Sequence, residues 1–154
     1  MERSPKQALQ ALLLRVRQAP PTGLYAAVEE GVPTRVVLLL AGAFGNTPAS
    51  VMNLIGVSET TFRRKEEAQE PLPEVAGHRM MGFLRIVALL QGLLEESGDP
   101  ARLADFDLEA WVSEWMREPL PELDGRTPAG MLHNPEGQRI VEDLLLRMRG
   151  GLPA

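Results

Sequence analysis

Cysteine is absent from this chain of 154 residues, which excludes both disulfides and thiolate metal sites. The two histidines, His78 and His133, lack carboxylates at a metal-site spacing, so we expect structural or surface residues. Asp105 and Asp107 are the closest approach to an acid pair, and an adjacent helix end explains them better than catalysis. With no glycine-rich phosphate loop and no Gly-x-Ser-x-Gly motif, the sequence predicts a protein that is not an enzyme and uses no metal or cofactor.

A long uncharged hydrophobic run is also missing. Val75–Leu94 is the most apolar stretch of the chain, but three side chains interrupt it: His78, Arg79 and Arg85. A buried helix is therefore a better interpretation of this stretch than a membrane span. The polar start, Met1–Lys6, is followed by an apolar run too short for a signal sequence. Together these absences predict a cytoplasmic protein with no membrane partner.

The charge is unevenly distributed. The formal net charge is −5, but residues 1–70 hold eight basic and seven acidic residues, a balance of +1. Residues 71–154 hold eight basic and fourteen acidic residues, a balance of −6. A contact with nucleic acid is therefore expected only in the first part. The proline-containing stretch 70–73 is the one obvious linker, so we predict two domains, residues 1–70 and residues 71–154.

Helical periodicity recurs along the whole chain, and no segment alternates as a strand would. We expect helices over residues 5–19, 22–30, 33–44, 48–55, 59–69, 74–96 and 100–118, the last broken near residues 105–107. Two further helices are expected after Thr127 and Asn134, because each is an oxygen-bearing N-cap followed by proline. The predicted fold class is all-α, with a helix-turn-helix bundle followed by a second helical domain.

Residues 47–69 predict the helix-turn-helix. Thr47 and Ser58 are suitable N-caps, and Gly56 provides the turn between two short helices. The second helix would be the recognition helix, and the candidate DNA-binding residues are Ser58, Thr60, Thr61, Arg63, Arg64 and Lys65. Arginine can read guanine edges bidentately, whereas hydroxyls and lysine would more often contact phosphate. Four flanking glutamates leave open the alternative of a helical hairpin with a solvated basic turn.

The segment from Trp111 to Gly150 carries the most functional information. Its pattern is Trp115-Met116-x-x-Pro119, Leu123-x-Gly125-x-Thr127-Pro128, Met131-Leu132, Gly137, Val141, Leu145 and Arg147-x-x-Gly150. In order and spacing this pattern resembles the Xre/MbcA/ParS-like toxin-binding antitoxin family. The upstream motif Gly56-Val57-Ser58-x-x-Thr61-Phe62-x-Arg64 is similar to the DNA-binding segment of the same family. The chain departs from the usual family residues at Thr60, Val112, Asp124 and Asn134.

The resemblance implies an antitoxin that binds a RES-domain toxin, an enzyme that destroys NAD. It also implies transcription regulation of the antitoxin's own operon through operator DNA. The last helix and the end of the chain would lie at the mouth of the toxin's NAD pocket, and the candidate toxin-binding residues are Arg139, Arg147, Arg149, Gly150 and Gly151. The alternatives are an Asp143–Arg147 pair within the helix and a frayed terminus.

A lone helix-turn-helix reads few base pairs, so we expect a homodimer within a larger toxin–antitoxin complex. The long apolar helix and the helix bearing Trp111 and Trp115 would supply the dimer interface. These two tryptophans lie on one helix face; an anchor for a partner is the alternative, and we interpret them as core residues. Two rival functions remain open: a stand-alone helix-turn-helix transcriptional regulator, and a protein-interaction adaptor that has lost DNA binding.

Overall fold

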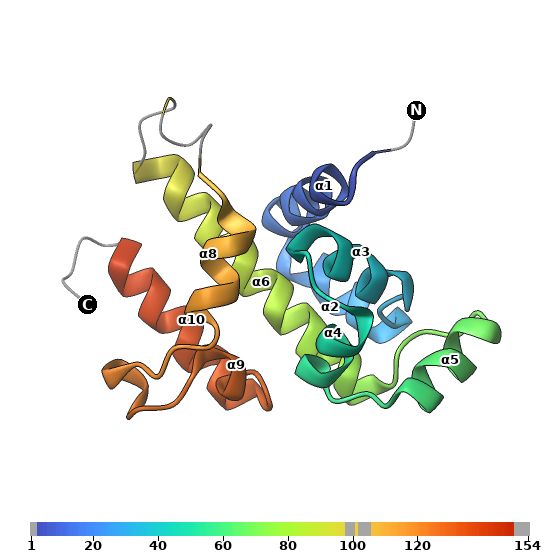
Figure 1. Ribbon diagram of the computed structural model, residues 1–154. Helices are drawn as coiled ribbons and strands as arrows, with labels where there is room; N and C mark the ends of the chain where they lie inside the picture. Colours follow the sequence, from blue (N-terminus) through green and yellow to red (C-terminus); the bar gives the residue numbers. More distant parts are fainter. Residues whose placement is uncertain (1–2, 98–100, 102–105, 150–154) are drawn as a thin grey trace. The chain divides into compact units, whose positions relative to one another are not determined.

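The computed structural model describes residues 3–97, 101 and 106–149 (Figure 1). These residues form nine α-helices, one short 3-10 helix and no strand, apart from an isolated bridge between Leu120 and Arg126. The predicted all-α class is confirmed. The chain divides into two compact units, Met1–Leu84 and Arg85–Ala154. The boundary between these units falls inside a helix, and the functional division at residue 70 stays a prediction.

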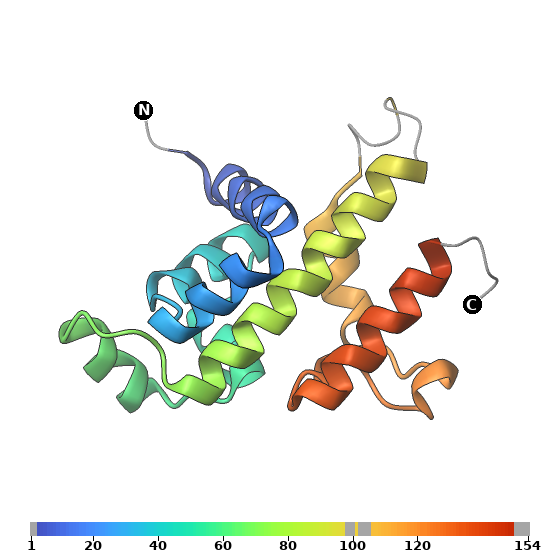
Figure 2. The same ribbon diagram turned by 180° about the vertical axis from the view of Figure 1, so that it is seen from behind.

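The N-terminal unit contains α1 (Pro5–Gln18), α2 (Pro21–Glu30), α3 (Arg35–Phe44), α4 (Pro48–Ile55), α5 (Glu59–Glu67) and the first part of α6 (Glu74–Ser97). Helix α1 packs on α3, α3 on α4, and α4 on α5. Figure 2 shows the opposite side of this unit, with α1 and α2 in view. Its core is made of aliphatic side chains from several helices, among them Leu9, Leu13, Val37, Leu40, Ile55 and Met80.

The C-terminal unit contains the rest of α6, α8 (Leu108–Trp115), η1 (Pro121–Leu123), α9 (Pro128–Met131) and α10 (Pro135–Arg149). Helix α9 packs against α10. The fully buried side chains of this unit are Ile86, Val87, Val112, Leu132, Val141 and Leu145. Most of the expected helix 100–118 before α8 lies outside the described residues. The predicted break is present where the structure describes it, because Phe106 and Asp107 are not helical.

Two helices end earlier than expected, for local reasons. Helix α5 stops at Glu67, because Gln69 takes a left-handed conformation (φ 55°) that no helix can continue. Helix α8 stops at Trp115 instead of extending to residue 118. The proline at position 119 disfavours helical geometry in the residue before it. In both cases the sequence pattern is right about the helix and wrong about its last turn.

No single helix in the described part of the chain combines the length and apolar character of a membrane span. Only α3 and α4 taken together pass such a test, and they are bent by 116° at their junction. The apolar stretch 75–94 belongs to α6, where Met80 and Met81 are buried as the sequence predicted. These methionines fill interior space, in keeping with the flexibility of their side chains.

Candidate functional site

The first candidate site is the corner between α4 and α5. Gly56 ends α4 in a left-handed conformation (φ 75°), and the Ser58 hydroxyl accepts a hydrogen bond from the Thr61 amide at 3.1 Å, as an N-cap should. From α6, Arg79 Nη1 donates to the Ile55 carbonyl at 3.4 Å. Among its nine residues, α5 buries only Phe62. The corner therefore presents nearly all of its second helix to solvent.

The six candidate DNA-binding residues separate into two groups. Ser58, Thr60, Arg63 and Arg64 are exposed, whereas Thr61 and Lys65 are half-buried. The Ser58 hydroxyl is engaged with Thr61, donating to its Oγ1 at 3.0 Å as well as capping the helix. Lys65 Nζ forms an ion pair with Glu70 at 3.1 Å. Arg63 and Arg64 form no ion pair within the described residues, so they hold the most accessible positive charge of α5.

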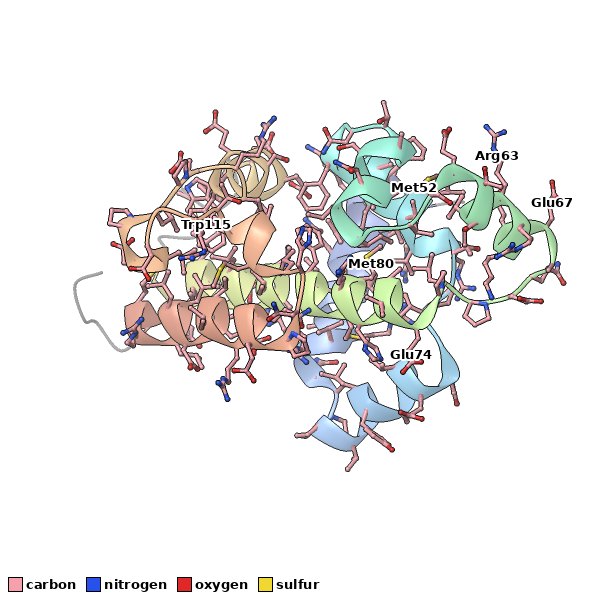
Figure 3. The ribbon with its side chains drawn as sticks, turned by 90° about the horizontal axis from the view of Figure 1, so that it is seen from below. Met52, Arg63, Glu67, Glu74, Met80 and Trp115 are labelled. Atoms are coloured by element: carbon pink, nitrogen blue, oxygen red, sulfur yellow. The ribbon has the colours of Figure 1, made fainter. Side chains whose placement is uncertain are left out.

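The acidic residues near α5 lie on more than one side of the helix. Glu66 and Glu70 line a pocket of about 480 Å³, together with Glu30 at the end of α2 and Arg35 at the start of α3. Glu67 lies on the outer side of the helix with Arg63 (Figure 3). All three of the α5-side glutamates are exposed, so they oppose the approach of a phosphate to the exposed face of α5.

The second candidate site is the corner between α9 and α10, which is held together by contacts to backbone carbonyls. Asn134 Oδ1 accepts a hydrogen bond from the Gly137 amide at 2.9 Å, which confirms the predicted cap. The buried Gln138 side chain donates to the Leu132 carbonyl at 3.1 Å. A side chain at Gly137 would collide with the carbonyl of Met131. Glycine is therefore needed here for close approach, although it lies in the first turn of a regular helix.

The outer surface of α10 carries the candidate toxin-binding arginines. Arg139 is exposed and pairs with Glu136 one turn earlier. Arg147 is exposed, and the alternative Asp143–Arg147 pair does not form in the structure. Arg149 is the last residue of α10. Nothing is described for its side chain, and Gly150 and Gly151 lie outside the described residues, so the proposed contacts of these three residues stay predictions.

The interpretation of the two tryptophans as core residues is wrong for Trp111. This side chain is 36% exposed, and its ring stacks on Trp115 with a centroid separation of 5.7 Å and an interplanar angle of 13°. The core face of α8 is taken by Val112 and Met116 instead. The sequence contains two interleaved pairs with the same four-residue spacing, so periodicity alone could not decide which pair turns inward. The exposed stack is thus a surface feature that the sequence missed.

The acidic groups offer no catalytic or metal-binding arrangement in the described residues. Asp107 Oδ1 accepts a hydrogen bond from the Ala110 amide at 3.0 Å, so this carboxylate caps α8. Asp105, its neighbour in the sequence, lies outside the described residues. The part of the chain that the structure describes contains no group of three or more histidine, aspartate or glutamate side chains suited to a metal ion. Both histidines, His78 and His133, lie at least partly in solvent.

Comparison with known proteins assigns a family description to each candidate site. Residues 23–85 match the antitoxin Xre-like helix-turn-helix domain, a range that contains the α4–α5 corner. Residues 99–151 match the antitoxin Xre/MbcA/ParS C-terminal toxin-binding domain, a range that contains α8, the tryptophan stack and the α9–α10 corner. A relative from Sphingobium sp. (strain YBL2), named Prs ADP-ribosylating antitoxin, is 27% identical over 134 residues, which are 87% of this chain and 82% of that protein.

Proposed function

Since this chain belongs to the Xre/MbcA/ParS-like antitoxins, we propose that the toxin it neutralises is a RES-domain enzyme that degrades NAD. The observation that supports this proposal is the match of residues 99–151 to a toxin-binding domain, downstream of a helix-turn-helix domain in the same chain. We further propose that the chain represses its own operon through α4 and α5. Toxin binding and DNA binding would then use different units of the protein.

The inhibitory contact is proposed for the end of α10. Arg147 is exposed on the last turns of this helix, and Arg149 ends it. A guanidinium there can pair with acidic groups of the toxin or occupy space that the dinucleotide needs. Gly150 and Gly151 would let the backbone approach the toxin closely, because they carry no side chain. Arg139 would contribute less, since Glu136 already neutralises part of its charge.

The name of the Sphingobium relative favours a second candidate for the toxin's reaction. That name contains the term Prs ADP-ribosylating, and transfer of ADP-ribose to a protein consumes NAD as the donor. The toxin of this chain would then modify a protein target, instead of only hydrolysing NAD. Both reactions need the same dinucleotide pocket, so the proposed inhibition at the end of α10 would serve either one.

The toxin proposal is tested by expressing the chain together with the protein encoded next to its gene, which we expect to be a RES-domain enzyme. Wild-type antitoxin should keep cellular NAD at its normal level. Deletion of residues 150–154 combined with Arg149→Ala should leave a folded antitoxin that binds the toxin while NAD falls. Arg15→Ala, which removes an exposed arginine from α1, is the matched control and should protect fully. Labelling of cell proteins with ADP-ribose separates transfer from simple hydrolysis.

Full protection by the truncated variant would exclude the end of the chain as the inhibitory contact. Inhibition would then have to come from the surface around residues 115–132. Failure of the wild-type chain to bind or silence that protein would instead contradict the choice of a RES-domain toxin. The chain would then neutralise another toxin or act as a stand-alone transcriptional regulator.

The DNA proposal rests on Arg63 and Arg64, the exposed and unpaired cations of α5 in the described structure. Arg64→Ala should weaken binding to the upstream operator by about 1–3 kcal/mol if the side chain contacts a base, and by less if it contacts phosphate. Lys65→Ala is the matched control, with a smaller expected effect because Glu70 already pairs with this lysine. An electrophoretic shift assay measures both. No shift with either protein at low salt would favour the adaptor that has lost DNA binding, and equal shifts with both would exclude Arg64 as a DNA contact.

A homodimer is proposed because two recognition helices are needed to read a symmetric operator. The interface would come from α6. Light scattering of the chain alone at micromolar concentration should give the mass of a dimer. A monomeric mass under these conditions would contradict the proposal, and operator binding would then have to depend on the toxin complex to bring two copies together.

A further inference from the structure

Exposed apolar side chains are concentrated in the unit that contains the toxin-binding match. Nine large apolar side chains are exposed among the described residues, and five of them lie within residues 99–151: Phe106, Trp111, Ile140, Leu146 and Met148. This range is about a third of the chain and holds more than half of the exposed set. Single exposed apolar side chains are common on protein surfaces, so the informative ones are those that lie together, as Trp111 and Trp115 do.

The tryptophan stack lies on a helix that is held by hydrogen bonds at both ends. Asp107 caps the start of α8 through the Ala110 amide at 3.0 Å. The end of α8 is fastened to α9, because the Ala129 amide donates to the Met116 carbonyl at 3.0 Å. Trp111 thus projects from a helix held at both ends, and its ring is supported by that of Trp115. A preorganised aromatic side chain loses little conformational entropy on binding, which is why tryptophan is common among binding hot spots.

The surface that follows the stack is acidic. Exposed carboxylates lie on the end of α8 and in the segment after it: Glu114, Glu118, Glu122 and Asp124. Two exposed arginines offset them, Arg117 and Arg126. Residues 111–126 therefore carry four negative and two positive charges, a balance of −2. The Arg117 side chain also donates to the Ser113 carbonyl at 3.0 Å. A partner of this surface should present an apolar slot with basic groups at its rim.

The same acidity argues against a second copy of this chain as the occupant. A two-fold dimer brings the same patch of both subunits together. Such pairing around Trp111 would place the carboxylates of Glu114 and Glu118 near their own copies, at a cost in repulsion. A toxin with a basic rim has no such penalty. The charge pattern therefore distinguishes the two partners that the function allows.

We propose that the Trp111–Trp115 stack is the anchor by which this antitoxin holds its toxin, through an apolar slot with a basic rim on the toxin surface. The inference rests on the proposed function, since it requires a toxin partner. Two places in the unit then have different roles: the stack provides affinity for the toxin, and the end of α10 blocks the toxin's NAD pocket. Loss of the anchor therefore weakens binding, whereas loss of the block leaves a complex in which the toxin is active.

The affinity of the purified chain for the toxin encoded next to its gene, expected to be a RES-domain protein, tests the proposal. Trp111→Ala should bind about 30-fold more weakly, as hot-spot tryptophans do, and Trp111→Phe should recover part of the loss. Tyr25→Ala removes an exposed aromatic side chain from the N-terminal unit and should bind as the wild type does. Far-UV circular dichroism shows that each variant is folded. Glu118→Lys should weaken binding several-fold, with the largest effect at low salt.

The possible outcomes distinguish failure of the anchor from failure of the proposed function. Equal affinity of Trp111→Ala and the wild type overturns the anchor and leaves the proposed function intact. No binding by the wild type overturns both the choice of toxin and the anchor. A smaller mass of Trp111→Ala than of the wild type, measured in the absence of toxin, would show that the stack joins two antitoxin copies, and this too overturns the proposal. A variant that binds weakly yet still protects at high expression supports it.

Discussion

The α4–α5 corner and the α9–α10 corner start their second helix with the same kind of N-cap, but different contacts hold each corner together. In both, an oxygen-bearing side chain caps the second helix, Ser58 in the first and Asn134 in the second. In the first corner, the long side chain of Arg79 donates a hydrogen bond to the Ile55 carbonyl. In the second corner, the backbone at Gly137 lies in close contact with the carbonyl of Met131.

The second helices of the two corners, α5 and α10, also differ in how deeply they are packed. Helix α5 buries one side chain, Phe62, and leaves most of its surface in solvent. Helix α10 buries one whole face, which includes Val141, Leu144 and Leu145, and only its outer face is exposed to solvent. A lightly anchored helix can adjust to a partner, whereas a deeply packed one holds a fixed geometry. The comparison indicates that the exposed surface of α5 is adaptable and that of α10 is preorganised.

The largest effect is expected for Gly137→Ala. Because the new methyl group would meet main-chain atoms of Met131, the backbone must move, and we expect a loss of about 3 kcal/mol in the free energy of unfolding of the C-terminal unit. Both tryptophans of the chain lie in this unit, so tryptophan fluorescence during urea unfolding reports on it. Gly130→Ala is the control, since its methyl group would meet only the Thr127 hydroxyl at 3.2 Å. Equal midpoints for the two variants would contradict the backbone contact.

A smaller effect is expected for Gly56→Ala. An alanine in the left-handed conformation costs about 1–2 kcal/mol, and its methyl group would displace the end of the Arg79 side chain. Gly45 also has a positive φ (66°), with no atom near its added methyl group, so Gly45→Ala measures the backbone cost alone. Circular dichroism during urea unfolding compares the two. If Gly56→Ala destabilises no more than Gly45→Ala, Arg79 contributes nothing to the corner.

The smallest effects are expected for removal of the two caps. Asn134→Ala should lower the free energy of unfolding of the C-terminal unit by about 1 kcal/mol, the usual value for an N-cap. Ser58→Ala should hardly change global unfolding, because α5 can fray while the rest of its unit stays folded. Amide hydrogen exchange should instead become faster in α5 alone. A drop in the stability of the whole N-terminal unit would show that α5 is anchored as firmly as α10.

The sequence predicted the parts of this molecule that depend on neighbouring residues. The N-caps at Ser58, Thr127 and Asn134 are confirmed, because capping is decided within four residues of the chain. The exposure of Trp111 was missed, because a choice between two equally spaced pairs depends on what packs against the helix.

The candidate surfaces could be predicted only in part, for a similar reason. The ion pair between Lys65 and Glu70 spans five residues, a separation that does not pair within a regular helix. It forms because Gln69 turns the chain back, and a glutamine at a left-handed position is not a signal that a sequence gives. The helical pattern implied that Arg63 and Arg64 are accessible. It did not indicate that Glu70 neutralises part of the charge of Lys65.

That ion pair has a consequence for how strongly salt should oppose operator binding. Each cation that neutralises a phosphate releases a condensed counterion, which adds about −0.9 to the slope of log affinity against log salt concentration. The charge of Lys65 is already balanced by Glu70. If α5 binds DNA as proposed, Arg63 and Arg64 alone give a contribution of about −1.8 for each recognition helix. Three free cations would have given about −2.7, so a titration of salt against affinity counts the charges that α5 brings to the operator.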